Sequence, residues 1–278
     1  MKFTKYFVAG KDYILINDND SIKSAEKICQ LCNRIKGIGA DAVISSTKTA
    51  PKTRRTTIFN NEHTLSEDHS SAAICAYYAT TKATDYSVHT FINSKNELVT
   101  VRRKSDSPYI FHCNMHSVTP TEIFNCVNRK TEIGNRILTI TPVYILDCFA
   151  VHFSSDKDKL DIMYLGQNIS VNSLFQKQAN LILAERTEKN SYKISFYENK
   201  TGCPRPTIAA LASTALAACK NGYSNYNENI NVSCDGFSVN ATCTSDENIT
   251  VECRAEKIFT GNLVQENTSA HSFYDIAL

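Results

Sequence analysis

The chain has 278 residues, of which 42% are hydrophobic and 21% are charged, the composition of a globular protein with buried cores. Its formal net charge of +2, with both signs interspersed, gives no reason to expect nucleic acid or an anionic membrane as a partner. No apolar run of about 18 residues predicts a transmembrane helix. Residues 1–6 lack the apolar core of a signal peptide. We therefore expect a cytoplasmic protein with no nucleic acid and no membrane partner.

The eleven cysteines are scattered through the chain. Because their number is odd and no signal peptide is expected, reduced thiols that pack as small hydrophobes are favoured over disulfides. Cys29 and Cys32 form one Cys-x-x-Cys pair, without a second pair at metal-ligand spacing. Both lie on the apolar face of a predicted helix, so core packing is favoured there and zinc binding is the alternative.

The first part of the chain predicts two strands, a helix and a buried strand. Residues 2–17 alternate in hydrophobicity around a turn at Gly10, which is typical of a strand pair. Ser21 then caps a helix that stops at the glycines of residues 37–39, before a short apolar strand at 42–44. The apolar residues of this helix have the spacing of one helix face: Ile22, Ala25, Ile28, Cys29, Cys32 and Ile35.

Two later segments repeat one arrangement. A strand that ends at Asn60 is followed nine residues later by His69 and a helix over residues 70–81. A strand that ends at Glu198 is followed nine residues later by Thr207, which opens a helix that ends at a Lys-Asn-Gly stop. Both helices are apolar on nearly every side, and such a helix must be buried on every side. We therefore predict two similar domains, each with a sheet wrapped around one central helix.

The predicted fold class is α/β with two pseudo-symmetric domains, each a mixed or antiparallel sheet around a buried helix. The polar stretch 117–121, which contains Pro120, is the expected linker. We assign residues 1–116 and 262–278 to the N-terminal domain and residues 117–261 to the C-terminal domain.

Several motifs occur in the order and at the spacing of one known family. Residues 36–41, Lys-Gly-Ile-Gly-Ala-Asp, are similar to the Gly-Ile-Gly-Ala/Phe-Asp signature of the diaminopimelate epimerases. The opening strands, the segments that lead into both buried helices and the closing strand also resemble motifs of this family; they lie at residues 1–13, 59–72, 197–210 and 256–261. The resemblance therefore spans almost the whole chain.

The resemblance implies a diaminopimelate-epimerase-like fold, a substrate cleft between the two domains and a mechanism without a cofactor. In this family two cysteines, one per domain, invert an amino-acid α-carbon: one thiolate removes the proton and the opposite thiol returns one. Each cysteine stands at the N-terminus of a buried helix. The partial positive charge and free N–H groups there stabilise a thiolate and hold the substrate carboxylate.

Both cysteine positions are changed in this chain, to His69 and Thr207. The neighbouring positions that hold the substrate carboxylate are changed as well, to Ser70 and Ser71 in the first half and Ile208 and Ala209 in the second. Three further substrate-binding positions match the family: Asn60, Asn180 and Glu198. Three others depart from it: Lys11, Asp147 and Asn199.

These departures exclude an ordinary two-thiol epimerisation. A threonine hydroxyl is too weak an acid and base to replace a thiol without an activating partner. A histidine, with an ordinary pKa of about 6.5, can act as a general base near neutrality. We therefore expect an isomerase or a lyase that transfers a proton at carbon without pyridoxal phosphate, on a small amino-acid-like or carboxylate substrate. His69 is the expected base and Thr207 is expected to face it; a homodimer is left open.

The alternatives assign these residues structural roles. His69 can cap its helix or hydrogen-bond at the domain interface, and Thr207 is a good N-cap for helical reasons alone. The chain would then be a pseudoenzyme, a non-catalytic homologue that binds a small molecule or a protein partner. A third hypothesis is metal binding by His63, Glu67 and His69, which share one loop; no metal is otherwise expected.

Overall fold

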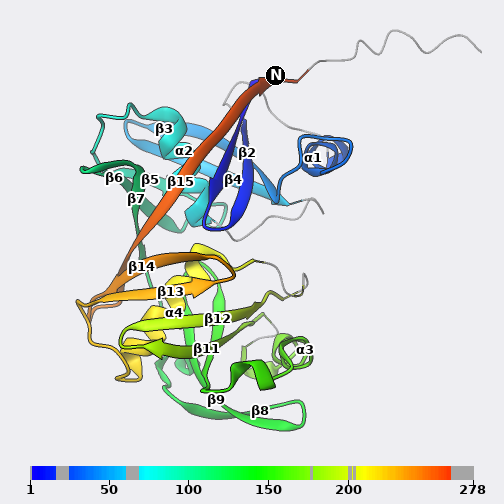
Figure 1. Ribbon diagram of the computed structural model, residues 1–278, viewed down its shortest axis with the longest axis vertical. Helices are drawn as coiled ribbons and strands as arrows, with labels where there is room; N and C mark the ends of the chain where they lie inside the picture. The colour runs from blue at the N-terminus through cyan, green and yellow to red at the C-terminus, as the bar shows by residue number, and fades with distance from the viewer. Residues whose placement is uncertain are drawn as a thin grey trace, which may run out of the picture.

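The computed structural model describes residues 2–16, 25–60, 69–175, 178–199, 202 and 205–263. The fold is mixed α/β, with a large sheet and few helices (Figure 1). The first part contains β1 (Lys2–Val8), β2 (Lys11–Ile16), α1 (Ala25–Cys32), β3 (Ala42–Ala50), β4 (Thr53–Asn60), α2 (His69–Thr80), β5 (His89–Ile92), β6 (Leu98–Lys104) and β7 (Ser107–His116).

The second part contains η1 (Glu122–Asn125), β8 (Arg129–Ile133), β9 (Arg136–Tyr144), β10 (Cys148–Phe153), η2 (Lys157–Lys159), α3 (Ile162–Ser170), η3 (Ser173–Phe175), β11 (Asn180–Glu188), β12 (Ser191–Tyr197), α4 (Ile208–Lys220), β13 (Asn229–Cys234) and β14 (Phe237–Cys243). The last strand is β15 (Asn248–Asn262). Within the described residues, no helix has the length and hydropathy needed to cross a membrane.

The sheet runs β1-β2-β3-β4-β5-β6-β7-β15, and β15 also pairs with β1, so these eight strands of the described chain close into a barrel. From β15 the sheet continues through β14, β13, β12, β11, β10 and β9 to β8. The first half of β15 lies between β7 and β14, and its second half lies beside β1. Figure 1 shows β15 crossing from one part of the molecule to the other. One strand therefore belongs to both halves of the sheet.

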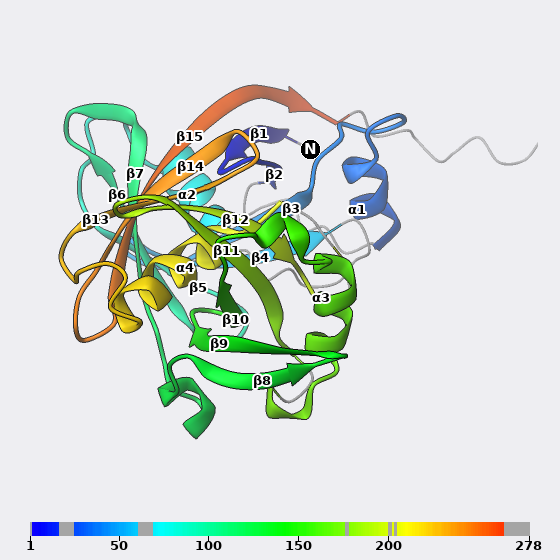
Figure 2. The same cartoon turned by 60° about the horizontal axis from the view of Figure 1, so that its bottom comes forward.

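Parallel strand pairs occur at matching places in the two halves: β2 with β3 and β4 with β5, then β10 with β11 and β12 with β13. Parallel neighbours need a crossover connection, which usually contains a helix. Here α1, α2, α3 and α4 supply these four crossovers in chain order. Each half thus has one crossover helix inside the curved sheet, α2 or α4, and Figure 2 shows α4 in this position.

The two apolar helices are buried as the sequence predicts. Every residue of α2 from His69 to Tyr77 is buried, and so is every residue of α4 from Ile208 to Cys219. Residues of both helices belong to one hydrophobic cluster that also includes strands of both halves, and the helices contact each other. Their alanines let the sheet approach closely on all sides, so burial here does not require an amphipathic pattern.

The prediction for the first helix was partly wrong. Its predicted start at Ser21 lies outside the described residues, and α1 ends at Cys32 instead of extending to Ile35, which is 91% exposed. Cys32 is buried in a small cluster beside β2 and β3, whereas Cys29 is exposed. The residues after Cys32 form a turn in which Asn33 accepts hydrogen bonds from two backbone N–H groups, and this competes with continuation of the helix.

Candidate functional site

The starts of α2 and α4 hold the two residues that occupy the cysteine positions. His69 is the first residue of α2 and is 3% exposed. Thr207 is the N-cap of α4 and is 6% exposed; its Oγ1 accepts a hydrogen bond from the backbone N–H of Ala210 at 3.1 Å. The capping role predicted for Thr207 is therefore confirmed. Both side chains lie where helix N–H groups and the helix dipole favour negative charge.

The residues that follow these two positions are buried. Ser70 donates a hydrogen bond from its hydroxyl to Met115 Sδ on β7, at 3.0 Å. Ser71 Oγ is buried and has no hydrogen-bond partner among the residues that the structure describes. On α4, the side chains of Ile208 and Ala209 are buried in the common core. The start of α2 is therefore the more polar of the two, with one buried hydroxyl whose hydrogen-bonding capacity is unused within the described structure.

Asn180 is held in a fixed orientation at the start of β11. Its Nδ2 donates to Asp147 Oδ2 at 2.6 Å and to the carbonyl of Cys148 at 3.1 Å. Its Oδ1 accepts from the backbone N–H of Asn199 at 2.8 Å. Asn180 therefore ties the turn before β10 to the segment after β12, and two of the three residues that depart from the family pattern, Asp147 and Asn199, are its partners.

For the two other predicted substrate-binding residues, Glu198 and Asn60, the structure shows how the backbone is paired. The backbone of Glu198 pairs with that of Gly202 through hydrogen bonds of 2.6 and 3.0 Å, and its side chain is half-buried. Asn60 ends β4 and its backbone pairs with Ala42 of β3, whereas its side chain lies outside the described part of the structure. The loop residues His63 and Glu67, of the metal hypothesis, also lie outside the described residues.

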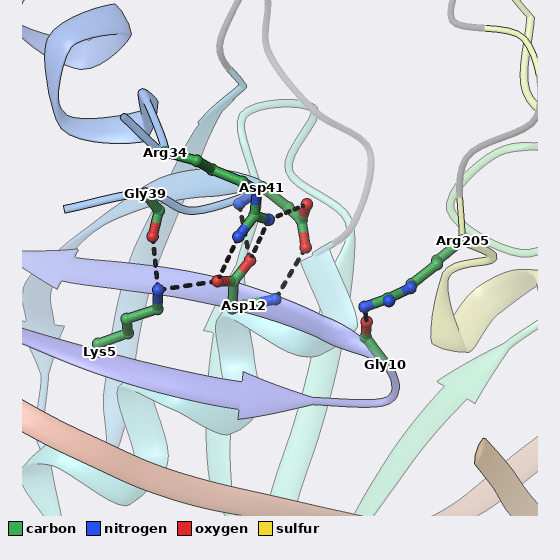
Figure 3. A network of polar contacts seen from close by, with 7 residues as sticks. All are labelled: Lys5, Gly10, Asp12, Arg34, Gly39, Asp41 and Arg205. Atoms are coloured by element: carbon green, nitrogen blue, oxygen red, sulfur yellow. Dashed lines mark hydrogen bonds and ion pairs between the residues drawn. The ribbon is translucent and has the colours of Figure 1, made fainter. Parts of the chain in front are cut away.

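The Gly-Ile-Gly-Ala-Asp signature ends in a polar network with β2 (Figure 3). Asp12 on β2 receives a bidentate hydrogen bond from Arg34, at 2.7 and 3.0 Å, and an ion pair from Lys5 at 2.9 Å. Asp41 accepts from Arg34 at 2.8 Å and from the backbone N–H of Asp12 at 2.9 Å. Lys5 also donates to the carbonyl of Gly39 at 2.6 Å. The signature therefore fastens the loop after α1 to the β1–β2 hairpin.

Ionisation in this network follows from burial and hydrogen bonding. Burial raises the pKa of Asp12, but hydrogen bonds from Arg34 and Lys5 outweigh burial and hold the pKa of this carboxyl well below its ordinary value. Burial raises the pKa of Asp41. Hydrogen bonds to Asp12 raise the pKa of the Arg34 guanidinium. Asp41 is part of the motif that the sequence shows, whereas the pairing of Asp12 with Arg34 could not be predicted, because it depends on the turn after α1.

A second contact missed from the sequence joins the two halves beside the start of α4. Arg205, two residues before Thr207, donates a hydrogen bond from its guanidinium to the carbonyl of Gly10 in the β1–β2 turn (Figure 3). The same turn lies against Phe237 at the start of β14; a Cβ added to Gly10 would lie 2.6 Å from the ring. Arg205 and Gly10 are 195 positions apart in sequence, so only the folded chain identifies the contact.

Comparison with solved structures identifies the fold. The chain shares its fold with structures described as racemases and epimerases. A probable proline racemase from Agrobacterium radiobacter K84 has a TM-score of 0.68 and 9% identity, over 97% of this chain and 94% of that chain. A protein described as a predicted epimerase from Pseudomonas aeruginosa has a TM-score of 0.65 and 11% identity, over 95% of this chain and 99% of that chain.

Sequence comparison narrows this class. No protein-family model matches the chain. The diaminopimelate epimerase of Trichodesmium erythraeum is 24% identical over 278 aligned residues, which cover 93% of this chain and 98% of that protein. The chain is therefore a divergent relative of the diaminopimelate epimerases, as its motifs predicted, and it differs from the family at both cysteine positions.

Proposed function

We propose that this chain is a cofactor-independent isomerase that transfers a proton at a carbon atom of a small amino-acid-like or carboxylate substrate. The names of its sequence relatives and structural neighbours, which are epimerases and racemases, support this reaction class. The substrate would bind between two pseudo-symmetric domains, residues 1–116 with 262–278 and residues 117–261, with β15 shared along their boundary.

The observation that carries the proposal is a buried imidazole at the start of a buried helix. His69 occupies the position of a family cysteine, and its side chain is 3% exposed at the first turn of α2. In this mechanism His69 removes the proton from the substrate carbon, the imidazolium exchanges its protons with water, and it then returns a proton to a carbon of the same substrate. The substrate carboxylate would accept hydrogen bonds from the first N–H groups of α2 and from the Ser71 hydroxyl.

Thr207 has a positioning role in this mechanism. Its Oγ1 already accepts the capping hydrogen bond from Ala210 N–H, and since no described residue accepts its hydroxyl proton, that proton would be donated to a substrate oxygen. The hydroxyl therefore orients the substrate and is not the second acid or base. A reaction with one base returns the proton from the side that lost it, which favours a proton shift between carbons over inversion of one carbon.

The second candidate is a non-catalytic homologue that binds a small molecule or a protein partner. Two observations favour it: the amide of Asn180 is already occupied by Asp147, Cys148 and Asn199, and Thr207 serves as an N-cap. In that case the starts of α2 and α4 keep the fold of the family but take no part in a reaction.

Hydrogen exchange at substrate carbon distinguishes the two candidates. The protein is incubated in deuterated water with a panel of L- and D-amino acids, hydroxyprolines and unsaturated dicarboxylates, and deuterium incorporation at carbon is followed by NMR. We expect exchange with at least one substrate, and we expect His69→Gln to slow it by about 100-fold or more because the general base is lost. Thr207→Ser, which keeps the cap and the hydroxyl, should keep most of the exchange.

Two results would count against the catalytic proposal. If the folded wild-type protein exchanges no proton of any compound in the panel, the non-catalytic candidate is favoured. If exchange persists in His69→Gln at the wild-type rate, the base is another residue and the assignment of His69 is wrong.

A further inference from the structure

The strand registers of the two halves make certain residues equivalent. Tyr13 is the first residue of β2 that pairs with β3, and Phe149 is the first residue of β10 that pairs with β11. Both side chains belong to the hydrophobic cluster that includes α2 and α4. Lys11 and Asp147 each lie two residues before these core residues, so they hold equivalent positions, one in each half. One position carries a cation and the other a carboxylate.

Lys11 and Asp147 lie on the face of the sheet that packs against the buried helices. Side chains alternate along a strand, so Lys11 shares the face of Tyr13, and it is half-buried there. Asp147 accepts a hydrogen bond from Nδ2 of Asn180 at 2.6 Å. Asn180 lies two residues before Ile182 of the same cluster and therefore shares its face. The two charged groups therefore lie on the inner side of the sheet.

The buried helices begin at the same end of the sheet. α2 connects β4 with the parallel strand β5, and α4 connects β12 with the parallel strand β13. Such a crossover helix begins beyond the end of the strand that precedes it, here Asn60 of β4 and Tyr197 of β12. Through β3 and β11, these strand ends are level with the starts of β2 and β10. The helix starts therefore lie beside Lys11 and Asp147.

The turn before β2 and the turn before β10 each contact the opposite half. The carbonyl of Gly10 accepts a hydrogen bond from Arg205, in the segment that leads into α4 (Figure 3). The hydroxyl of Tyr144, at the end of β9, donates to Glu97 Oε1 at 3.3 Å, between β5 and β6. Both turns therefore lie at the boundary between the two halves.

The first half offers groups that suit an anion. We call Lys11 and the start of α2 the first rim. Lys11 supplies an ammonium group, and the first N–H groups of α2 carry the positive end of the helix dipole. Ser71 Oγ is buried there and has no hydrogen-bond partner in the described part of the chain. The first rim therefore suits a substrate carboxylate.

The second half offers carboxylates in the equivalent place. We call Asp147, Asn180 and Glu198, beside the start of α4, the second rim. The Asp147 carboxylate is fixed, because Oδ1 accepts from the backbone N–H of Cys148 at 2.8 Å and Oδ2 accepts from Asn180. Glu198 is half-buried. A ligand group that reaches the Asn180 amide also meets the Asp147 carboxylate, which repels an anion and attracts an ammonium group.

We propose that Lys11 and Asp147 select the charge of the substrate. The site takes a compound with a carboxylate at the first rim and an ammonium group at the second rim, and it rejects a second carboxylate there. The inference rests on the proposed function for the location of the site and adds the class of substrate. Lys11 donates to the carboxylate, Asp147 accepts from the ammonium group, and the reacting carbon lies between them. Both act by orienting the substrate and not by proton transfer.

Binding of three matched probes tests the proposal without requiring turnover: L-norvaline, 2-hydroxyvalerate and propylmalonate. They share a propyl chain and one carboxylate on the same carbon, and the second polar group on that carbon is an ammonium, a hydroxyl or a second carboxylate. NMR titration of the full-length protein at pH 7 gives each Kd. We expect norvaline to bind about 10-fold more tightly than 2-hydroxyvalerate, and propylmalonate to bind most weakly.

Variants assign the two rims. Asp147→Asn keeps the shape of the side chain and removes its charge, so it should weaken norvaline binding about 10-fold, leave 2-hydroxyvalerate nearly unchanged and strengthen propylmalonate binding. Lys11→Met should weaken all three, because each probe carries the carboxylate of the first rim. Asp156→Asn and Lys130→Met, which remove exposed charges outside both rims, are the controls and should change none of the three.

Three results overturn the proposal: no probe binds, propylmalonate binds as tightly as norvaline, or Asp147→Asn weakens all three probes equally, as a purely structural role would. If circular dichroism shows that Asp147→Asn does not fold, the order of the probes in the wild-type protein and the response to Lys11→Met decide. Deuterium exchange separates this inference from the isomerase proposal. Binding in the expected order without exchange removes only the isomerase, and exchange without that order removes only the charge selection.

Discussion

At the scale of single residues, the starts of the two buried helices carry different side chains, His69 on α2 and Thr207 on α4. Both residues are buried, and Thr207 serves as the cap of its helix. An N-cap needs a side-chain oxygen acceptor and an extended backbone, and Thr207 supplies both.

Gly10 is a residue at which adding a single methyl group should clearly lower the stability of the protein. Its φ of +83° is strained for any L-residue, and an added Cβ would lie 2.6 Å from the ring of Phe237. We expect Gly10→Ala to lower the free energy of unfolding by about 2–4 kcal/mol, from backbone strain and overpacking together. Urea denaturation followed by circular dichroism measures the change.

The matched control for Gly10 is Gly236→Ala. Gly236 has a φ of +88°, but no heavy atom lies within 4 Å of the position that a Cβ would take there, so this variant suffers backbone strain alone. The difference between the two variants reports the clash with Phe237, and Phe237→Leu in the Gly10→Ala background should recover part of it. Equal losses in both variants would show that the contact between the turn and β14 is not tight.

At the scale of elements, helices and strands are joined by polar links as well as by the core. The loop after α1 is fixed to β1 and β2 through Lys5, Asp12, Arg34 and Asp41. Arg34 is largely exposed whereas Asp12 is mostly buried, so Asp12 is the member of the pair whose charge depends most on the fold. The position of the loop should therefore depend on pH.

Asp12 should make the protein acid-sensitive. Its pKa in the folded state lies below the unfolded value of about 3.9, so its stabilising contribution is fully present above that pH and is lost as pH falls below it. We expect Asp12→Asn to lower the free energy of unfolding by about 1–3 kcal/mol at pH 6 and to flatten its decline toward pH 2. Urea denaturation at several pH values measures both effects.

The control for Asp12 is Asp156→Asn, which removes a carboxylate from a surface pair with Lys159. Because both side chains of that pair are well exposed, this variant should follow the wild-type pH profile. Asp41, whose pKa burial raises, acts in the opposite sense, since protonating it at low pH relieves the cost of its burial. If Asp12→Asn declines as steeply as wild type, the network does not govern acid stability.

At the scale of the whole molecule, β15 and the two buried helices make one cooperative structure. β15 pairs with β7 and β14 along its first half and with β1 along its second. The hydrophobic cluster beneath it contains residues of α2 and α4 and of strands from both halves. A defect in β15 should therefore weaken both halves together.

Val251→Ala tests this cooperativity. Val251 is fully buried on β15 between β7 and β14, and its loss should lower the free energy of unfolding by about 2 kcal/mol. In hydrogen exchange followed by mass spectrometry, peptides from α2 and from α4 should lose protection by similar factors. The control Ile133→Ala lies in the separate cluster formed with α3, and it should affect β8, β9 and α3 more than α2. Loss of protection confined to α4 in Val251→Ala would show that the halves open independently.

The sequence was most informative where local pattern and burial coincide. Helices that are apolar on every side, such as α2 and α4, are stable only when they are buried in a protein core. Their burial and approximate limits therefore followed from composition. It was less informative for α1, where periodicity suggested that Cys29 and Ile35 face a core; the turn after Cys32 exposes Ile35, and Cys29 lies on the exposed side of the short helix. Periodicity counts apolar residues but does not show where a helix stops.

Sequence was sufficient for the mixed α/β class, the two buried helices, the helix cap at Thr207 and the relation to diaminopimelate epimerases, because each depends on residues close together in the chain or on motifs in a fixed order. The folded chain was needed to show that β15 is shared by both halves, that Arg205 reaches Gly10, and that Arg102, His112 and Glu252 form one row on the sheet. These contacts join residues that are far apart in sequence, and strand register, which local pattern leaves undetermined, brings them together.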